Sequence, residues 1–113
     1  MSVDKSFHGG LVLEEGYTLE DSLGSVGDGW ADLVRAFYQA CEDAGIKIVQ
    51  VKEKFGGLRM YTDYPPAHIR KLEVEMETKS LKTCEPCGKP GKPTTNNYWI
   101  KTVCEECDVK RQV

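Results

Sequence analysis

Four of the five cysteines in this chain fall into two pairs that could bind a metal ion. Cys84 and Cys87 form the first pair, and Cys104 and Cys107 form the second, with residues 88–103 between them. Within each pair two residues separate the cysteines, so both sulfurs can turn toward one ion, and two such pairs are typical of a structural zinc site. Four thiolates complete the tetrahedral shell of Zn²⁺ and leave no position for water. The sequence therefore predicts one structural zinc ion.

Disulfide bonds and redox-active thiols are the alternatives for these cysteines. Residues 1–5 lead into no apolar signal segment, and Cys41 leaves an odd number of cysteines, so we expect the reducing cytoplasm, where disulfides are rare. A thioredoxin-like motif has one pair beside a βαβ pattern, whereas this chain has two pairs. Because no apolar run approaches the roughly 18 residues of a membrane span, we expect no membrane partner.

Charge is unevenly distributed along the chain, although the net charge is only −3. Residues 1–50 carry 3 basic and 9 acidic side chains (net −6), residues 51–77 carry 5 of each (net 0), and residues 78–113 carry 7 basic and 4 acidic (net +3). A zinc ion bound by four thiolates adds about −2 to the last segment. This balance argues against a dedicated nucleic-acid-binding protein, whose domain is normally clearly basic.

An amphipathic helix is predicted from Trp30 onward, because apolar residues recur there at helical spacing. Asp28 suits its N-cap and Gly45 a left-handed C-terminal cap. Cys41 falls on the apolar stripe, so we expect it to be a small buried hydrophobe. The stripe consists of Trp30, Leu33, Val34, Phe37, Cys41 and Ala44.

A β-hairpin and a second helix are predicted next. Residues 46–54 and 58–63 are β-branched, alternating runs on either side of Gly56 and Gly57, which suit a turn that needs positive φ. Pro66 fits the first turn of the following helix. The apolar face of that helix consists of Ile69, Leu72, Met76 and Ser80.

The predicted fold class is α+β, with a helix–β-hairpin–helix core over residues 28–83 and a zinc module over residues 84–113. Within the module we expect a cysteine knuckle followed by Gly88 with positive φ, turns over residues 89–97, a strand over 98–103 and a short helix from Cys104. That order is typical of a treble-clef arrangement, with a zinc ribbon as the alternative. Residues 1–27 are glycine-punctuated and predicted to be irregular, apart from a short strand at residues 11–13.

Two surfaces are candidates for binding a partner. Around the hairpin turn, Lys52, Lys54, Phe55 and Arg59 form a small cationic knob for an acidic partner, unless these lysines only protect a sheet edge from aggregation. In the zinc module, basic and aromatic side chains could contact phosphates and stack on bases, unless Trp99 anchors the small core. This second set is Lys89, Lys92, Tyr98, Trp99, Lys101, Lys110 and Arg111.

Three features together resemble a family of small, poorly characterised proteins of bacteria and their phages. They are Gly29 and Trp30 at the start of the helix, the stretch at residues 49–61 that reads VQVKEKFGGLRMY, and the two cysteine pairs. The resemblance covers about residues 28–107 and implies a phage- or prophage-associated zinc protein. By analogy, small phage proteins often bind and inhibit a host protein.

No recognisable catalytic constellation is present in the sequence. The two histidines, His8 and His68, have no neighbouring nucleophile with motif support, and the glycines match no phosphate-binding loop. We therefore expect a non-enzymatic zinc protein that binds and modulates, and could inhibit, a host protein or complex. The alternative is a regulatory nucleic-acid-binding zinc module.

Overall fold

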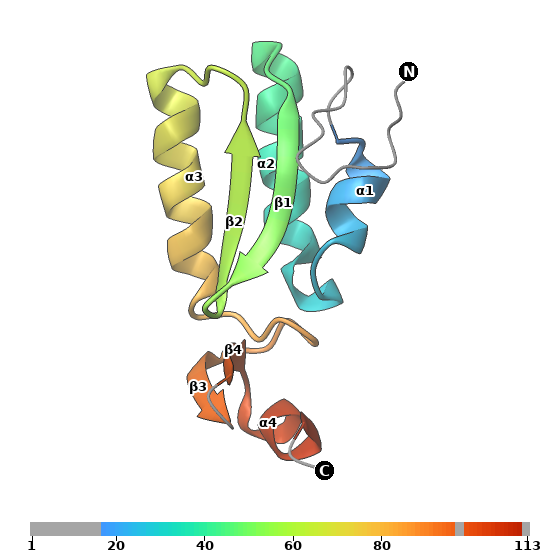
Figure 1. Ribbon diagram of the computed structural model, residues 1–113, viewed down its shortest axis with the longest axis vertical. Helices are drawn as coiled ribbons and strands as arrows, with labels where there is room; N and C mark the ends of the chain where they lie inside the picture. The colour runs from blue at the N-terminus through green and yellow to red at the C-terminus, as the bar shows by residue number, and fades with distance from the viewer. Residues whose placement is uncertain (1–16, 97–98, 112–113) are drawn as a thin grey trace.

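The structure, a computed structural model, describes residues 17–96 and 99–111 as a mixture of helices and two antiparallel hairpins (Figure 1). The predicted α+β class is confirmed. In chain order the elements are α1 (Leu19–Gly24), the 3₁₀ helix η2 (Asp28–Trp30), α2 (Ala31–Ala44), β1 (Ile48–Lys54), β2 (Gly57–Thr62), α3 (Ala67–Ser80), β3 (Lys92–Asn96), β4 (Trp99–Val103) and α4 (Glu105–Arg111).

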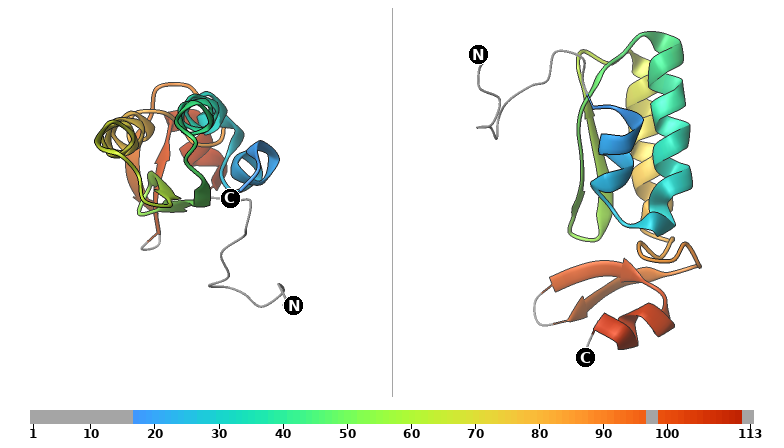
Figure 2. Two further views of the ribbon diagram at one scale, coloured as in Figure 1. Left: turned by 90° about the horizontal axis from the view of Figure 1, so that it is seen from above. Right: turned by 90° about the vertical axis from the view of Figure 1, so that its right-hand side faces the viewer.

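The hairpin of β1 and β2 is covered on one face by α2 and α3, which lie side by side behind it (Figures 1 and 2). The second hairpin, β3 with β4, and α4 form the lower part of the molecule, beyond the tip of the first hairpin (Figure 1). The predicted order of helix, hairpin and helix is confirmed for residues 31–80.

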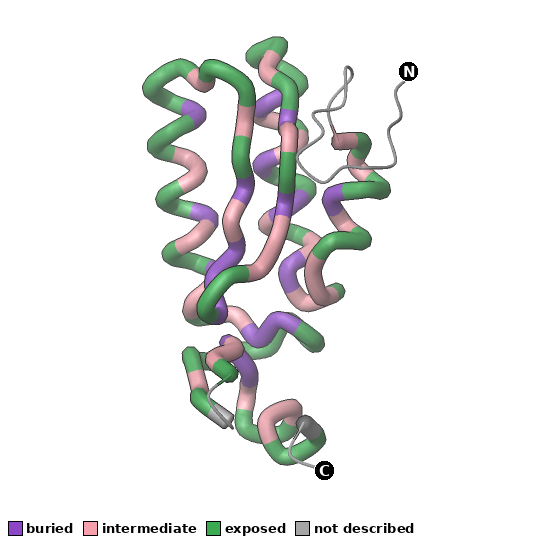
Figure 3. Tube along the Cα trace, in the orientation of Figure 1, coloured by how far each residue is buried: buried purple, intermediate pink, exposed green. Residues whose placement is uncertain are grey.

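The hydrophobic core fills the space between the hairpin and the two helices. Burial recurs along α2, α3, β1 and β2 (Figure 3) because each helix turns one stripe toward the same interior as the inner face of the hairpin. In β1 the buried Ile48 and Val51 are three residues apart, because the strand is irregular between Ile48 and Gln50. Cys41 lies in this core and is 1% exposed, as expected. The buried set is Trp30, Val34, Phe37, Cys41, Ile48, Val51, Leu58, Met60, Ile69 and Met76.

The turn of the first hairpin lies one residue earlier than predicted. The residues with positive φ are Phe55 (54°) and Gly56 (85°), whereas Gly57 begins β2 and pairs with Lys54. A two-residue hairpin turn with positive φ at both positions matches the right-handed twist of the strands. The sequence was misleading because Phe is an unusual residue at such a position, and the Gly56–Gly57 pair was the stronger signal.

Three local predictions are wrong. Residues 19–24 form α1, which begins with a capping box in which Thr18 accepts from the Asp21 amide while the Asp21 carboxylate accepts from the Thr18 amide. Asp28 does not cap α2; it opens η2, whose N-cap is Gly27. Residues 92–96, predicted as turns, form β3 because they pair in register with β4. The strand expected at residues 11–13 and His8 lie outside the described residues.

Candidate metal centre

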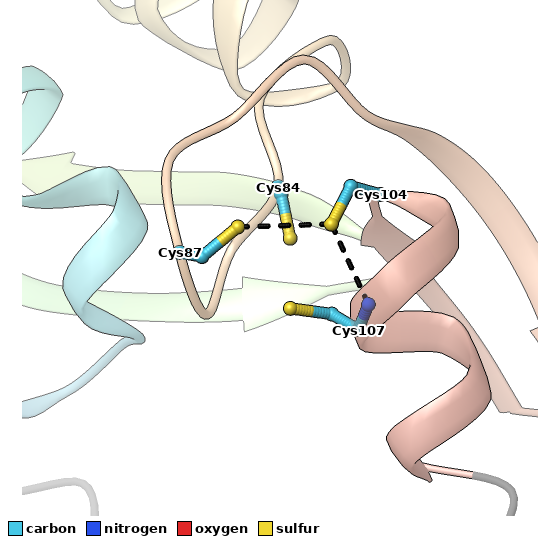
Figure 4. A group of neighbouring side chains, drawn as sticks. All are labelled: Cys84, Cys87, Cys104 and Cys107. Atoms are coloured by element: carbon cyan, nitrogen blue, oxygen red, sulfur yellow. Dashed lines mark hydrogen bonds between the residues drawn. The ribbon is translucent and has the colours of Figure 1, made fainter.

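The four paired cysteines meet at one point between the lower hairpin and the rest of the molecule (Figure 4). Cys84 and Cys87 come from the loop between α3 and β3, Cys104 immediately precedes α4, and Cys107 lies in its first turn. All four Sγ atoms lie within 4.8 Å of one another. The structure therefore brings together the complete predicted ligand set.

The spacing of the sulfurs fits a tetrahedral metal ion. A Zn–S bond of about 2.3 Å in a tetrahedral site puts neighbouring sulfurs about 3.8 Å apart. The Sγ atoms of Cys87 and Cys104 are 3.7 Å apart. Cys84 is fully buried, whereas Cys87 is exposed, so the cluster is anchored on one side and open to solvent on the other. Four cysteines in this arrangement could hold one metal ion.

The loop that carries the first pair has the geometry of a knuckle. The Gly88 amide donates to the Cys84 carbonyl at 2.8 Å, and the Cys84 amide donates to the Lys89 carbonyl at 2.7 Å. Gly88 has φ of 86°, which confirms the prediction of positive φ there, and only glycine adopts it without strain.

Backbone donors and burial act in opposite directions on the thiols of the cluster. The Cys107 amide donates to Cys104 Sγ at 3.4 Å, and this contact lowers the pKa of Cys104 to about 7. Burial raises the pKa of Cys84, and it is also the main cause that raises the pKa of Cys107 to about 12. Metal binding must therefore displace protons from the thiols that burial keeps neutral.

Gly29 allows η2, which directly precedes α2, to lie directly on the knuckle. Its amide donates to the Glu85 carbonyl at 2.6 Å. A Cβ built at Gly29 would overlap the Cys84 carbonyl oxygen and the Gly88 amide nitrogen, so no side chain fits there. The neighbouring Trp30 is fully buried, and its indole Nε1–H donates to the Thr83 carbonyl at 2.8 Å.

Glu85, between the two knuckle cysteines, connects three segments although it is only 5% exposed. One carboxylate oxygen accepts from the Gly27 amide at 2.9 Å, and the other lies 3.2 Å from Lys101 Nζ on β4. The Glu85 amide donates to the Thr102 carbonyl at 2.9 Å. A buried carboxylate is tolerable only with such partners.

The tip of the first hairpin is fixed to β4. The hydroxyl of Thr102, which is fully buried, donates to the Gly56 carbonyl at 2.6 Å. A Cβ added at Gly56 would lie 3.3 Å from both Ile100 and Thr102, so the turn packs closely on this strand. We call the contact set formed by residues 27–30, Gly56, residues 84–88 and Thr102 the junction.

The residues of the predicted hairpin surface lie on β1, on β2 and in the turn between them. Lys52 lies over the Tyr61 ring at 5.6 Å and Lys54 over the Phe55 ring at 5.7 Å. Phe55 is 67% exposed. Arg59 lies 3.4 Å from the Glu77 carboxylate of α3, so part of its charge is neutralised.

The residues of the predicted nucleic-acid-binding set differ in exposure and in their charged neighbours. Lys89 Nζ lies 3.1 Å from Glu106, and Lys101 pairs with Glu85, so two of its cations already face carboxylates. Trp99 is 64% exposed and does not anchor the core. Lys92 and Lys110 are exposed, while Tyr98 and the side chain of Arg111 lie outside the described residues.

Two residues of the junction were not recognised as important from the sequence. Glu85 lies between Cys84 and Cys87, and the spacing of those cysteines predicts no role for the residues between them. Thr102 is an ordinary strand residue. Gly29 was noted only as a neighbour of Trp30. A glycine that precedes a core tryptophan at a helix start was the available signal for a close backbone approach.

No family model matches the chain, and no curated protein or solved structure matches it either. Fold and site together define an α+β protein with one four-cysteine cluster suited to a metal ion. Within residues 17–96 and 99–111, none of the helices combines the length and the apolar character needed to cross a bilayer.

Proposed function

We propose that the protein is a non-enzymatic module, stabilised by one bound zinc ion, that binds and modulates another protein. The metal-ligand set supports a structural ion, because four sulfurs complete a tetrahedral shell and leave no position at which a substrate or water could be activated. Sulfur ligands in this geometry favour Zn²⁺. The resemblance to bacterial and phage proteins makes a host protein the partner that we propose.

The arrangement of elements around the four cysteines supports a treble clef rather than a zinc ribbon. A knuckle supplies Cys84 and Cys87, the β3–β4 hairpin follows, and the N-terminus of α4 supplies the second pair. In a ribbon, a second knuckle would supply that pair. The positive end of a helix also favours thiolates near its first turn.

The main support for a binding function is that two aromatic side chains are exposed at the same place. Phe55 and Trp99 are 67% and 64% exposed, and both line the same surface hollow beside the junction. Large aromatic side chains around a hollow are typical of protein-binding surfaces, where their burial supplies much of the affinity.

The test is affinity capture of the full chain from its native host, with and without nuclease treatment, and with the zinc content measured on the same sample. We expect one zinc ion per chain and a protein partner recovered in near-equal amount whether or not nucleic acid is digested. Cys84→Ser should lose both the metal and the partner, because the junction depends on the knuckle.

Two results would contradict the proposal. Recovery of no protein in stoichiometric amount would remove the binding function. A capture that disappears after nuclease treatment would favour the nucleic-acid-binding alternative, for which Lys92, Lys110 and Trp99 are the remaining exposed candidates.

A further inference from the structure

A hollow of about 300 Å³ lies where the tip of the β1–β2 hairpin meets β4. Its lining comes from both parts of the molecule: Glu53, Lys54 and Phe55 from the hairpin, and Trp99 and Ile100 from β4. The sequence assigned Phe55 and Trp99 to two different candidate surfaces. The structure joins them into one.

The outer face of the hairpin leads to this hollow and is cationic. Val51, Leu58 and Met60 turn toward the core, so strand alternation puts the side chains directly next to them in each strand on the opposite face. Lys52 and Arg59 are direct cross-strand partners on that face. The outer face consists of Gln50, Lys52, Lys54, Arg59 and Tyr61, without a carboxylate.

Among the described residues that line the hollow, Glu53 carries the one carboxylate, and this carboxylate accepts a hydrogen bond. Glu53 lies on the inner side of β1, opposite Leu58, and its Oε2 accepts from the Gly56 amide at 2.7 Å. Lys54 is exposed and lies at the rim, while Arg59 shares its charge with Glu77. Glu53 keeps its negative charge in this contact, so Lys52 and Lys54 together leave a small positive excess at the hairpin tip.

The junction fixes the positions of Phe55 and Trp99, the two aromatic residues that line the hollow, relative to each other. Phe55 is the first residue of the tight turn, and the next residue, Gly56, accepts the buried hydrogen bond from Thr102 on β4. Trp99 and Ile100 begin that same strand. A ligand that enters between them finds a preformed site, so less affinity is lost to ordering.

A larger hollow, of about 600 Å³, lies between β3 and α4, but its chemistry is different. Lys92, Glu105 and Asp108 border it, and none of the described residues that line it is aromatic. Its lining mixes both signs of charge with the apolar Val103 and Pro90, and this mixture gives no preference for a ligand class. The aromatic hollow is the better-defined candidate.

We propose that the aromatic hollow and the outer face of the hairpin bind an extended, acidic segment of a partner protein, with one large apolar side chain of that segment seated between Phe55 and Trp99. This inference rests on the proposed protein-binding function and specifies its surface. Carboxylates of the segment pair with Lys52 and Lys54, and the apolar side chain fills the hollow.

A single-stranded nucleic acid could also stack on exposed aromatic rings. Such binding needs a run of cations along the phosphate backbone. Here Lys89 and Lys101 face carboxylates, so they do not extend Lys52 and Lys54 into such a run. The two hairpin lysines match the few carboxylates of a short acidic peptide better.

The test is selection of a random 12-residue peptide library on the zinc-loaded full chain, followed by fluorescence anisotropy with the enriched peptides. We expect Asp or Glu residues on either side of a Leu, Phe or Trp. Phe55→Asn and Trp99→Thr should each weaken binding by at least about tenfold, as loss of a central aromatic contact does. Lys54→Glu should weaken it less, and added salt should reduce its effect.

These variants are chosen to keep the fold. Asn tolerates the positive φ at position 55, and Thr suits the strand at position 99. Val74→Thr removes an equally exposed apolar side chain on α3, and Lys71→Glu reverses an exposed charge there, so both should bind like the wild type. Zinc content and circular dichroism confirm folding of each variant.

The inference is overturned if the library yields no binder, if the enriched peptides are basic or lack an apolar residue, or if their binding survives Phe55→Asn and Trp99→Thr. It is also overturned if fluorescent oligo(dT) binds the chain and competes with the selected peptides. Peptides that bind elsewhere leave the proposed function standing, because that function is judged by capture of the host partner.

Discussion

Most of the core residues lie between Gly29 and Glu85 in the sequence, yet the backbones of these two residues are in direct contact. The Gly29 amide donates to the Glu85 carbonyl at 2.6 Å, and a Cβ added to Gly29 would lie 2.5 Å from that oxygen. The cysteine knuckle and η2 therefore form one packed unit, in which the absence of a side chain at Gly29 is a structural requirement.

Gly29→Ala should destabilise the protein by about 2–3 kcal/mol, because the new methyl group forces the knuckle away from η2. Chemical denaturation of the zinc-loaded chain measures this change. Gly24→Ala is the matched control: nothing lies within 4 Å of a Cβ at that helical position, so the change should be neutral or stabilising by up to about 1 kcal/mol. Equal effects at both positions would contradict the close approach.

Replacement of a cluster cysteine should abolish metal binding, whereas replacement of Cys41 should not. Cys104→Ser removes one of the four sulfurs that share one centre, while Cys41 lies in the hydrophobic core. Inductively coupled plasma mass spectrometry should give one zinc ion per chain for the wild type and Cys41→Ala, and a clear deficit for Cys104→Ser. A wild-type chain purified without metal would refute the structural ion.

Thr102→Val should cost about 1–3 kcal/mol, because it keeps the shape of the side chain but leaves the buried Gly56 carbonyl without its donor. Thr95→Val on β3 is exposed and should cost little. Hydrogen exchange should show faster opening at the hairpin tip only in the Thr102 variant. Unchanged protection there would mean that the tip is held by other contacts.

The stability that Cys41 contributes should fall at alkaline pH. Burial, with a smaller effect of Glu73, raises the pKa of its thiol from 9.0 to about 11 in the folded chain. Because the folded pKa is the higher one, the contribution is complete below pH 9 and is lost as the pH rises through 11. The free-energy difference between wild type and Cys41→Val should change by about 2–3 kcal/mol over this window. A flat difference would show that the thiol is not protected from ionisation.

Phe55→Asn should stabilise the hairpin while it removes the aromatic wall. Phe55 has φ of 54° and is largely exposed, so its side chain gains little from packing and its backbone is strained. Asn suits this turn better, and a gain of up to about 1 kcal/mol is expected from thermal melting. Destabilisation would mean that the ring makes a structural contact. A stabilising change that weakens binding would identify Phe55 as a residue kept for function.

Much of the fold could be predicted from the sequence because the patterns are strong. The apolar spacing from Trp30 to Cys41 predicted α2, and the spacing from Ile69 to Ser80 predicted α3. The grouping of the four cysteines could be predicted from the two pairs alone. The helix at residues 19–24 was missed because the glycines around it suggested turns, although Thr18 and Asp21 carried a capping-box pattern.

The junction could not be predicted, because it depends on tertiary contacts that leave no periodic signal. The pairing of β3 with β4 overrides the turn preference of Pro93 and Asn96. The contact between Gly56 and Thr102 joins residues 46 positions apart. For the same reason the sequence could not show that Phe55 and Trp99 line one hollow.

The two tryptophans of the chain occupy opposite environments. Trp30 is fully buried at the junction, where its indole N–H donates a hydrogen bond. Trp99 is largely exposed at the hollow. The molecule thus contains two intrinsic optical probes: the buried indole should emit at shorter wavelength and report whether the metal loop is seated. The exposed indole should be quenched by acrylamide until a ligand shields it, so a titration in Trp30→Phe or Trp99→Phe can follow each event separately.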